Sequence, residues 1–143
     1  MAPILLSILL SLAAGPHGQA EPPVFLVVVN EANAVETMSV EQLSKIFLRK
    51  LARWQNGSRI TVVDQHPATP VRERFSADVH RRPVAAVVAY WQQQIFSGRE
   101  LPPSERKDDA AVLEHVRQNP EAVGYVSAQT PLGPGVKVLR VTS

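Results

Sequence analysis

Apolar residues are concentrated in four short segments that are predicted to be extended. The first run, VFLVVV at 24–29, has no polar position within it. A strand without alternation is covered on both faces, as in a sheet that lies between helices. RITVV at 59–63, AVGYVSA at 122–128 and VKVLRV at 136–141 also contain several β-branched residues. These four segments are predicted strands.

The segment MSVEQLSKIFLRKL at 38–51 has the apolar spacing of a helix instead. Ser39 is predicted to cap its start, and Gln42 three residues later completes a capping-box pattern. Its apolar residues share one face of a helix, and they are Val40, Leu43, Ile46, Phe47 and Leu51.

Three further helices are predicted. Thr69 followed by Pro70 is typical of a helix start, and a second helix begins near Pro83 and ends at Gly98. The second helix has the apolar stripe Val84, Val87, Val88, Trp91 and Ile95, which is predicted to face the core together with Phe96. The last helix begins at Asp108 and stops before Pro120. The stretch 99–107, RELPPSERK, is predicted to be an exposed loop.

Strands and helices therefore alternate in the order strand, helix, strand, three helices, strand, strand. This order predicts an α/β fold in which a mixed sheet is flanked by helices.

The first twenty residues differ from the rest because they contain no charged side chain. The apolar run at 4–14 is too short to span a membrane, and Ala20 with Gly18 before it suits a signal-peptidase site. We expect 1–20 to be a signal peptide, 21–143 to be a single domain, and the product to be periplasmic or secreted. The alternative is a buried first strand or helix, which the absence of Lys or Arg near Met1 favours. No later segment is long and apolar enough to span a membrane.

Charge and composition exclude several function classes. The formal net charge is only +2, which gives no basic field for a nucleic acid. The chain has no cysteine, so a disulfide framework or a thiolate zinc site is excluded. The histidines are isolated, and no enzyme, phosphate-loop or dinucleotide motif occurs. We therefore expect no enzyme, no catalytic residue, no metal site and no cofactor. The pair Asp108–Asp109 is interpreted as charge at a helix start.

The junction after the second strand is the candidate binding site. The first turn of a helix exposes unpaired N–H groups, here those of Val71, Arg72 and Glu73, and its dipole favours an anion. The hydroxyl of Thr69 and the guanidinium of Arg72 could add hydrogen bonds. His66 precedes this turn and is a further candidate ligand. The alternative is that Thr69 only caps the helix and that Arg72 faces solvent.

Two segments and the junction between them together resemble the phosphate-binding proteins of ABC transporters, which are type II periplasmic binding proteins. The resemblance extends from Val24 to about Val126. LSKIFLRKLARWQNGSRITVV at 43–63 carries the pattern Ile-Phe, Lys, Trp and Asn at Ile46, Phe47, Lys50, Trp54 and Asn56. In VRQNPEAVGYV at 116–126, Val123, Gly124, Tyr125 and Val126 match the Ile-Gly-Tyr-Val strand that follows a helix in that family.

The resemblance implies one lobe of a two-lobed fold that holds an oxyanion. The family motif Arg-Ser-Asp-Gly-Ser-Gly-Thr is altered here: Gln65 stands at the arginine position, Pro67 at the aspartate position, and Thr69 is the one hydroxyl that remains. Selectivity for phosphate needs an acceptor for the proton of the ligand, and Asp64 or His66 would have to supply it.

Two hypotheses follow. In the first, an exported solute-binding-like protein binds inorganic phosphate or a related oxyanion at Thr69, Val71, Arg72 and His66, in association with an ABC permease. In the second, a lobe without high-affinity ligand capture serves as a protein-interaction module, with apolar surface covered by a partner or by self-association. The loop 101–107 would flank that contact.

Overall fold

The structure is a computed structural model that describes residues 24–143. The proposed signal peptide, 1–20, lies outside the described residues. Within residues 24–143, no helix is long and apolar enough to cross a membrane.

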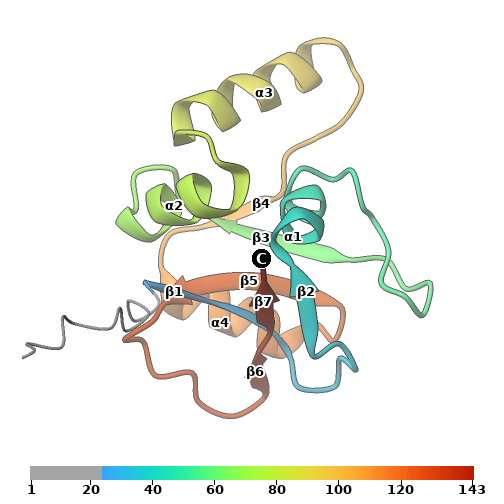
Figure 1. Cartoon of the computed structure of the whole chain (residues 1–143), viewed down its shortest axis with the longest axis vertical. Helices are drawn as coiled ribbons and strands as arrows, with labels where there is room; N and C mark the ends of the chain where they lie inside the picture. Colours follow the sequence, from blue (N-terminus) through green and yellow to red (C-terminus); the bar gives the residue numbers. More distant parts are fainter. Residues whose placement is uncertain (1–23) are drawn as a thin grey trace, which may run out of the picture.

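A five-stranded mixed sheet forms the centre of the molecule (Figure 1). Its strands are, in spatial order, β4 (Ser104–Arg106), β3 (Thr61–Gln65), β5 (Ala122–Ser127), β1 (Phe25–Asn30) and β6 (Val136–Val138). β3 runs parallel to β4 and β5, whereas β1 runs antiparallel to β5 and β6. A separate parallel pair joins β2 (Thr37–Ser39) to β7 (Arg140–Thr142).

Helices cover both faces of this sheet, which explains the unbroken apolar run of β1. Successive side chains of a strand point to opposite faces. Val27 and Val29 pack in a cluster with residues of α1 (Val40–Phe47) and α2 (Pro70–Phe75). Val28 packs in a second cluster with residues of α4 (Asp109–Gln118). The predicted α/β class, with a mixed sheet flanked by helices, is confirmed.

The predicted cap of α1 is present, and the helix is shorter than expected. Ser39 accepts a hydrogen bond from the amide of Gln42, whose side chain accepts from the amide of Ser39, which completes the capping box. The helix ends at Phe47, and Leu48 is its C-cap. Arg49 then takes a left-handed conformation with φ of 56°. This turn removes Leu51 from the helix, although Leu51 still packs on the core from the loop.

The helix predicted to begin at Thr69–Pro70 is confirmed as α2, with Thr69 as its N-cap. It continues as a π-helical turn, η1 (Ser76–His80). Arg81 ends this turn with φ of 55°, and Pro83 precedes α3 (Val84–Phe96).

The prediction that the stripe of α3 faces the core is wrong for its outer half. Val87 and Trp91 are buried, but Ile95 is 49% exposed and Phe96 is 94% exposed. α3 projects from the body of the molecule (Figure 1) and packs through Val87 and Trp91 beside Leu48. The spacing of apolar residues predicts which face of a helix can be buried. Among residues 24–143, no other element packs on the C-terminal end of this helix, so that part of the face stays exposed.

Two short strands were not predicted. β4 lies within the stretch 99–107 that was expected to be a loop, and β2 lies just after the polar stretch that follows β1. The run VKVLRV is divided at Leu139 into β6 and β7, which belong to different sheets. β2, β4, β6 and β7 each have three residues. Their pairing with distant strands defines them, rather than a local apolar pattern.

Candidate functional site

The candidate site lies where β3 ends and α2 begins. The turn 66–69 follows the C-terminal end of β3, which lies between its parallel neighbours β4 and β5. The carboxyl ends of strands in an open α/β sheet are where ligands commonly bind.

Thr69 forms hydrogen bonds within its own turn. Its hydroxyl donates to the carbonyl oxygen of His66 at 2.9 Å and accepts from the amide of Arg72 at 3.3 Å. The amide of Glu73 donates to the carbonyl oxygen of Thr69 at 3.2 Å. Of the three amides predicted to face an anion, those of Arg72 and Glu73 are therefore engaged. The amide of Val71 remains available.

Arg72 is buried and faces the end of β3, with only 4% of its surface exposed. The alternative that Arg72 faces solvent is therefore wrong. Its Nη1 donates to the carbonyl oxygen of Gln65 at 2.8 Å and to Oε1 of Glu105 at 3.1 Å. Its Nε lies 3.7 Å from Oδ1 of Asp64. The guanidinium is therefore shared between a buried carboxylate of β3 and the carboxylate of Glu105, whose side chain is 40% exposed.

Asp64 lies on the α2 side of the sheet, deep in the molecule. Its Oδ1 accepts a hydrogen bond from the hydroxyl of Tyr125 and another from the amide of Gln65 at 2.8 Å. Burial raises the pKa of Asp64, and the charge of Arg72 and these hydrogen bonds oppose that effect. Burial and the neighbouring Asp64 also raise the pKa of Tyr125. Asp64 is 4% exposed and reaches no open surface as an acceptor for a ligand.

Gln65, which the resemblance aligns with the arginine of the phosphate-binding motif, points to the α4 side of the sheet. Its Nε2 donates to Oδ1 of Asp109 at 2.6 Å and to the carbonyl oxygen of Tyr125 at 3.0 Å. Asp109 also accepts from Thr130 at 2.6 Å and from the amide of Ser127 at 3.2 Å. Burial alone would raise the pKa of Asp109, but these hydrogen bonds from Thr130, Gln65 and Ser127 lower it.

Asp108 and Asp109 act separately at the start of α4. Asp108 caps the helix by accepting from the amide of Ala111 at 2.9 Å. Asp109 is turned toward β3 and β5 through the bonds described above. This agrees with the interpretation of the pair as residues of a helix start.

His66 is exposed beside the turn. Its Nδ1 accepts a hydrogen bond from the amide of Ala68 at 3.1 Å. The neutral imidazole therefore carries its proton on Nε2, which is free to donate outward. The amide of Val71 and Nε2 of His66 are thus the two predicted donors that have no hydrogen-bond acceptor among residues 24–143.

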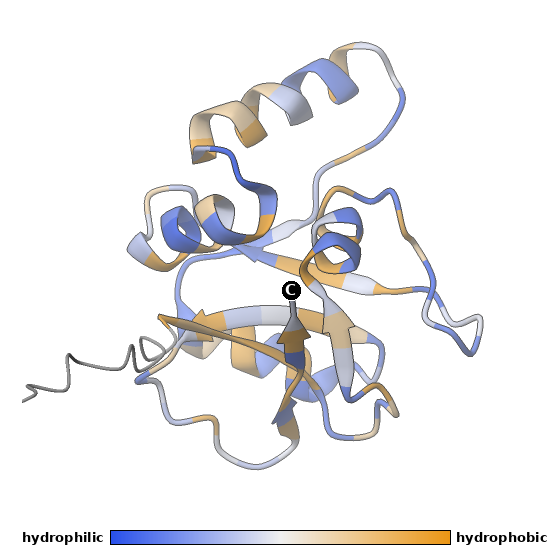
Figure 2. Ribbon diagram, in the orientation of Figure 1, coloured by the Kyte–Doolittle hydropathy of each residue, from blue (hydrophilic) through white to orange (hydrophobic). Residues whose placement is uncertain are grey.

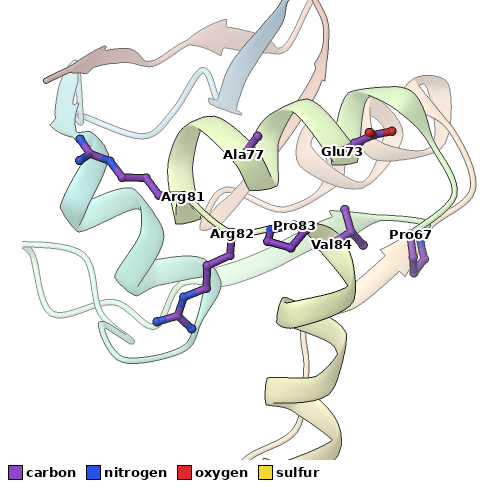
Figure 3. A pocket seen from close by; sticks show the side chains of 7 residues that line it. All are labelled: Pro67, Glu73, Ala77, Arg81, Arg82, Pro83 and Val84. Atoms are coloured by element: carbon purple, nitrogen blue, oxygen red, sulfur yellow. The ribbon is translucent and has the colours of Figure 1, made fainter.

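A shallow hollow of about 610 Å³ adjoins this turn. Figure 3 shows its lining residues: Pro67 in the turn, Glu73 and Ala77 on the outer side of α2 and η1, and Arg81, Arg82, Pro83 and Val84 where α3 begins. The side chains of Arg81 and Arg82 point in different directions (Figure 3). The two guanidinium groups therefore do not converge on one anion.

A second cavity, of about 530 Å³, lies at the opposite end of the sheet, where β3 and β5 begin. It is lined in part by Asn33, Met38, Trp54, Ile60 and Glu121. The indole of Trp54 is held there by a hydrogen bond to the carbonyl oxygen of Glu121 at 3.1 Å. No group of three residues suited to a metal ion occurs in the part of the chain that the structure describes.

The sequence predicted the helix start at Thr69, which the structure confirms, but it did not predict the partners of Arg72. Glu105 and Tyr125 come from β4 and β5, far along the chain. A carboxylate at the end of an apolar strand, Asp64, was the one local signal that a cation had to lie close by.

Solved structures of phosphate-binding proteins share this fold. The chain is similar to a protein with bound phosphate from Clostridium perfringens, described as a phosphate ABC transporter substrate-binding protein, with a TM-score of 0.65, 16% identity, and coverage of 82% of this chain and 44% of that one. It is equally similar to an ABC-type phosphate transport receptor from Vibrio cholerae, with a TM-score of 0.65, 20% identity, and coverage of 82% and 46%. PstS from Borrelia burgdorferi matches with a TM-score of 0.58, 12% identity, and coverage of 84% and 47%. The expected resemblance is confirmed at the level of the fold.

The chain spans less than half of each of these three proteins, in keeping with a single lobe. No protein-family model matches the chain, and no curated protein matches it.

Proposed function

We propose that the chain is an exported, single-lobe solute-binding protein that binds phosphate or a related oxyanion at the start of α2, without covalent chemistry. The fold shared with phosphate-binding proteins and the position of the turn at the carboxyl end of β3 support this proposal. The finding that carries it is the placement of Arg72, whose guanidinium lies next to the turn and is held on its outer side by Glu105.

The anion would replace Glu105 as the partner of Arg72. The side chain of Glu105 is 40% exposed, so it can turn into solvent, whereas Asp64 is buried and stays in place. The ligand would then accept hydrogen bonds from Nη1 of Arg72, from the amide of Val71 and from Nε2 of His66. Charge-assisted bonds of this kind are the stronger hydrogen bonds in proteins.

Binding at this site is expected to be weak and sensitive to salt. Asp64 and Glu105 together already offset the charge of Arg72. A single lobe also leaves the ligand in contact with water, where electrostatic attraction is much smaller than in a closed site.

Calorimetry with phosphate, sulfate and acetate tests the proposal. Glu105→Gln removes the competing charge, so it should bind phosphate about tenfold more tightly than the native chain, which corresponds to about 1.4 kcal/mol. Glu114→Gln, at an exposed position of α4, is the matched control and should behave as the native chain does. His66→Ala should weaken any binding. If neither the native chain nor Glu105→Gln gives heat at millimolar ligand, the anion site does not exist.

The alternative is a protein-interaction module, and the exposed end of α3 favours it. That helix offers apolar surface that anion binding does not use. Loss of all anion heat together with capture of a partner through α3 would support this alternative over a binding protein.

Export and contact with an ABC permease belong to the same proposal. They rest on the uncharged segment 1–20 and on the transport proteins that share the fold. Expression in a bacterium, followed by fractionation and N-terminal sequencing, should give periplasmic protein that begins at Glu21. Unprocessed protein in the cytoplasm would contradict the export.

A further inference from the structure

α3 differs from the other α-helices among residues 24–143 because it carries no charge. Its 13 residues, VAAVVAYWQQQIF, include no Asp, Glu, Lys or Arg, whereas α1, α2 and α4 all contain acidic and basic residues. Figure 2 shows apolar colours along much of this helix, although it stands away from the body. A helix that is apolar around most of its circumference is normally buried.

Only one side of α3 is covered. Val87 and Trp91 pack beside Leu48, while Phe96 is 94% exposed and Leu101, just beyond the helix, is 66% exposed. Exposed apolar residues grouped in this way commonly mark a surface that binds a partner.

The outer side of α3 carries a regular stripe made of Ala85, Ala89, Gln92 and Phe96, all of them exposed. Their spacing of four, three and four residues keeps them on one face of a helix. The side chains of this stripe are small at the N-terminal end of the helix, where both are alanine, and large at the C-terminal end, where Phe96 lies.

This stripe is complementary to a second copy of itself that runs in the opposite direction. In an antiparallel pair, Phe96 of each copy lies over Ala85 of the other, and Ala89 lies beside Gln92. The two contacts at the ends are identical, as a two-fold symmetric interface requires. In a parallel pair, Phe96 would meet Phe96, and the two alanines at position 85 would leave a gap.

Charge and area also favour a second copy. Because α3 is uncharged, two copies do not repel one another there, and a strongly acidic or basic partner finds no opposite charge on the helix. A 13-residue helix is about 20 Å long, and each Phe96 brings about 150–250 Å² to the contact. The total is on the order of 1,000 Å², which is near the lower limit for a specific interface.

We propose that α3 is a self-association helix, through which two copies of this chain pair in antiparallel orientation along the stripe Ala85–Ala89–Gln92–Phe96. The proposal rests on α3 alone and does not depend on the anion site, so either one can fail without the other. The modest area predicts a reversible dimer that forms at micromolar concentrations and dissociates on dilution.

Sedimentation velocity of the purified full chain over a range of concentrations tests the pairing. The native chain should change from monomer to dimer as its concentration rises. Ala89→Glu places two carboxylates in the centre of the contact and should raise the dissociation constant of the dimer at least tenfold. Ala110→Glu makes the same substitution at an exposed position of α4 and should leave the dimer unchanged. Phe96→Ser is a second test, and it removes no core packing because Phe96 is exposed.

Two results would overturn the proposal. One is a native chain that stays monomeric at every concentration, even if another protein binds α3. The other is equal association by Ala89→Glu and Ala110→Glu.

Disulfide trapping tests the orientation, and it is clean because the chain has no cysteine. A mixture of Ala85→Cys and Phe96→Cys chains should cross-link to each other faster than either chain cross-links to itself. Faster self-linking of Ala85→Cys would overturn the antiparallel arrangement.

Discussion

The hydroxyl of Tyr125 in β5 donates a hydrogen bond to Oδ1 of Asp64 in the neighbouring strand β3. Both side chains are buried, and the ring of Tyr125 stacks on Phe75 of α2 with centroids 3.8 Å apart. The contact joins the sheet to the helix that begins at the candidate site, because Asp64 also lies beside Arg72.

Tyr125→Phe should lower the free energy of unfolding by about 1–3 kcal/mol, because Asp64 loses a donor inside the molecule while the aromatic packing is kept. Urea denaturation measures this change. Tyr90→Phe, on the half-buried Tyr90 of α3, is the control and should have little effect. Equal stability of Tyr125→Phe and the native chain would show that the hydrogen bond contributes nothing net.

Arg72→Met should destabilise the protein by about 3–5 kcal/mol, because it leaves Asp64 as a buried charge without its cation. Arg74→Ala is two residues away, and its ion pair with Asp78 is exposed on both sides, so its loss should cost less than about 1 kcal/mol. Adding Asp64→Asn to Arg72→Met should recover part of the loss. If the double variant is no more stable than the single one, the buried charge is not the cause.

Stability should fall as the pH drops from about 6.5 to about 4, through the titration of His80. Nδ1 of His80 forms a hydrogen bond with Oγ of Ser44 at 2.8 Å, and the imidazole ring packs edge-on against the ring of Phe75. Burial, with the charges of Arg72 and Arg82, lowers its pKa from 6.5 to about 4. The unfolded chain therefore binds more protons than the folded protein in this window, and acid favours unfolding.

Protonation of His80 is expected to lower the free energy of unfolding by about 3 kcal/mol once the folded and unfolded states are both fully protonated. Denaturation of the native chain and of His80→Asn is measured at a series of pH values. The difference between the two curves gives the contribution of His80, because the carboxylates contribute equally to both. Parallel curves for the native chain and His80→Asn would refute the prediction.

Gly124→Ala should destabilise the protein by about 1–3 kcal/mol through overpacking. A Cβ atom at Gly124 would lie 2.8 Å from Cγ1 of Val112 in α4 and 2.8 Å from Cγ1 of Val63 in β3. Thermal or chemical denaturation measures the loss. Combining it with Val112→Ala should cost less than the sum of the two single changes, because residues in contact couple. Strict additivity would argue against this close approach.

Local patterns predicted the elements that define the fold. The apolar run of β1, the capping box at Ser39 and the pair Thr69–Pro70 are each decided by neighbouring residues, and each was confirmed. The turn after β3, which we propose as the binding site, could be predicted for the same reason.

The direction of Arg72 could not be predicted, because its partner Glu105 lies 33 residues further along the chain. It becomes a neighbour only through the pairing of β3 with β4, a short strand without a sequence signal. The exposure of Phe96 was missed for a related reason. An apolar stripe shows what a helix can bury, and the arrangement of the other elements decides whether anything covers it.

The place of β1 in the sheet sets the time at which the protein can fold. β1 is held between β5 and β6, so that Val28 faces both Gly124 and Val138. During translation, β1 is made well before its partners β5 and β6, so it cannot pair until they have left the ribosome. Pairing between segments so far apart in the chain slows folding, and until β5 and β6 are available the apolar run VFLVVV can be bound by chaperones or can aggregate.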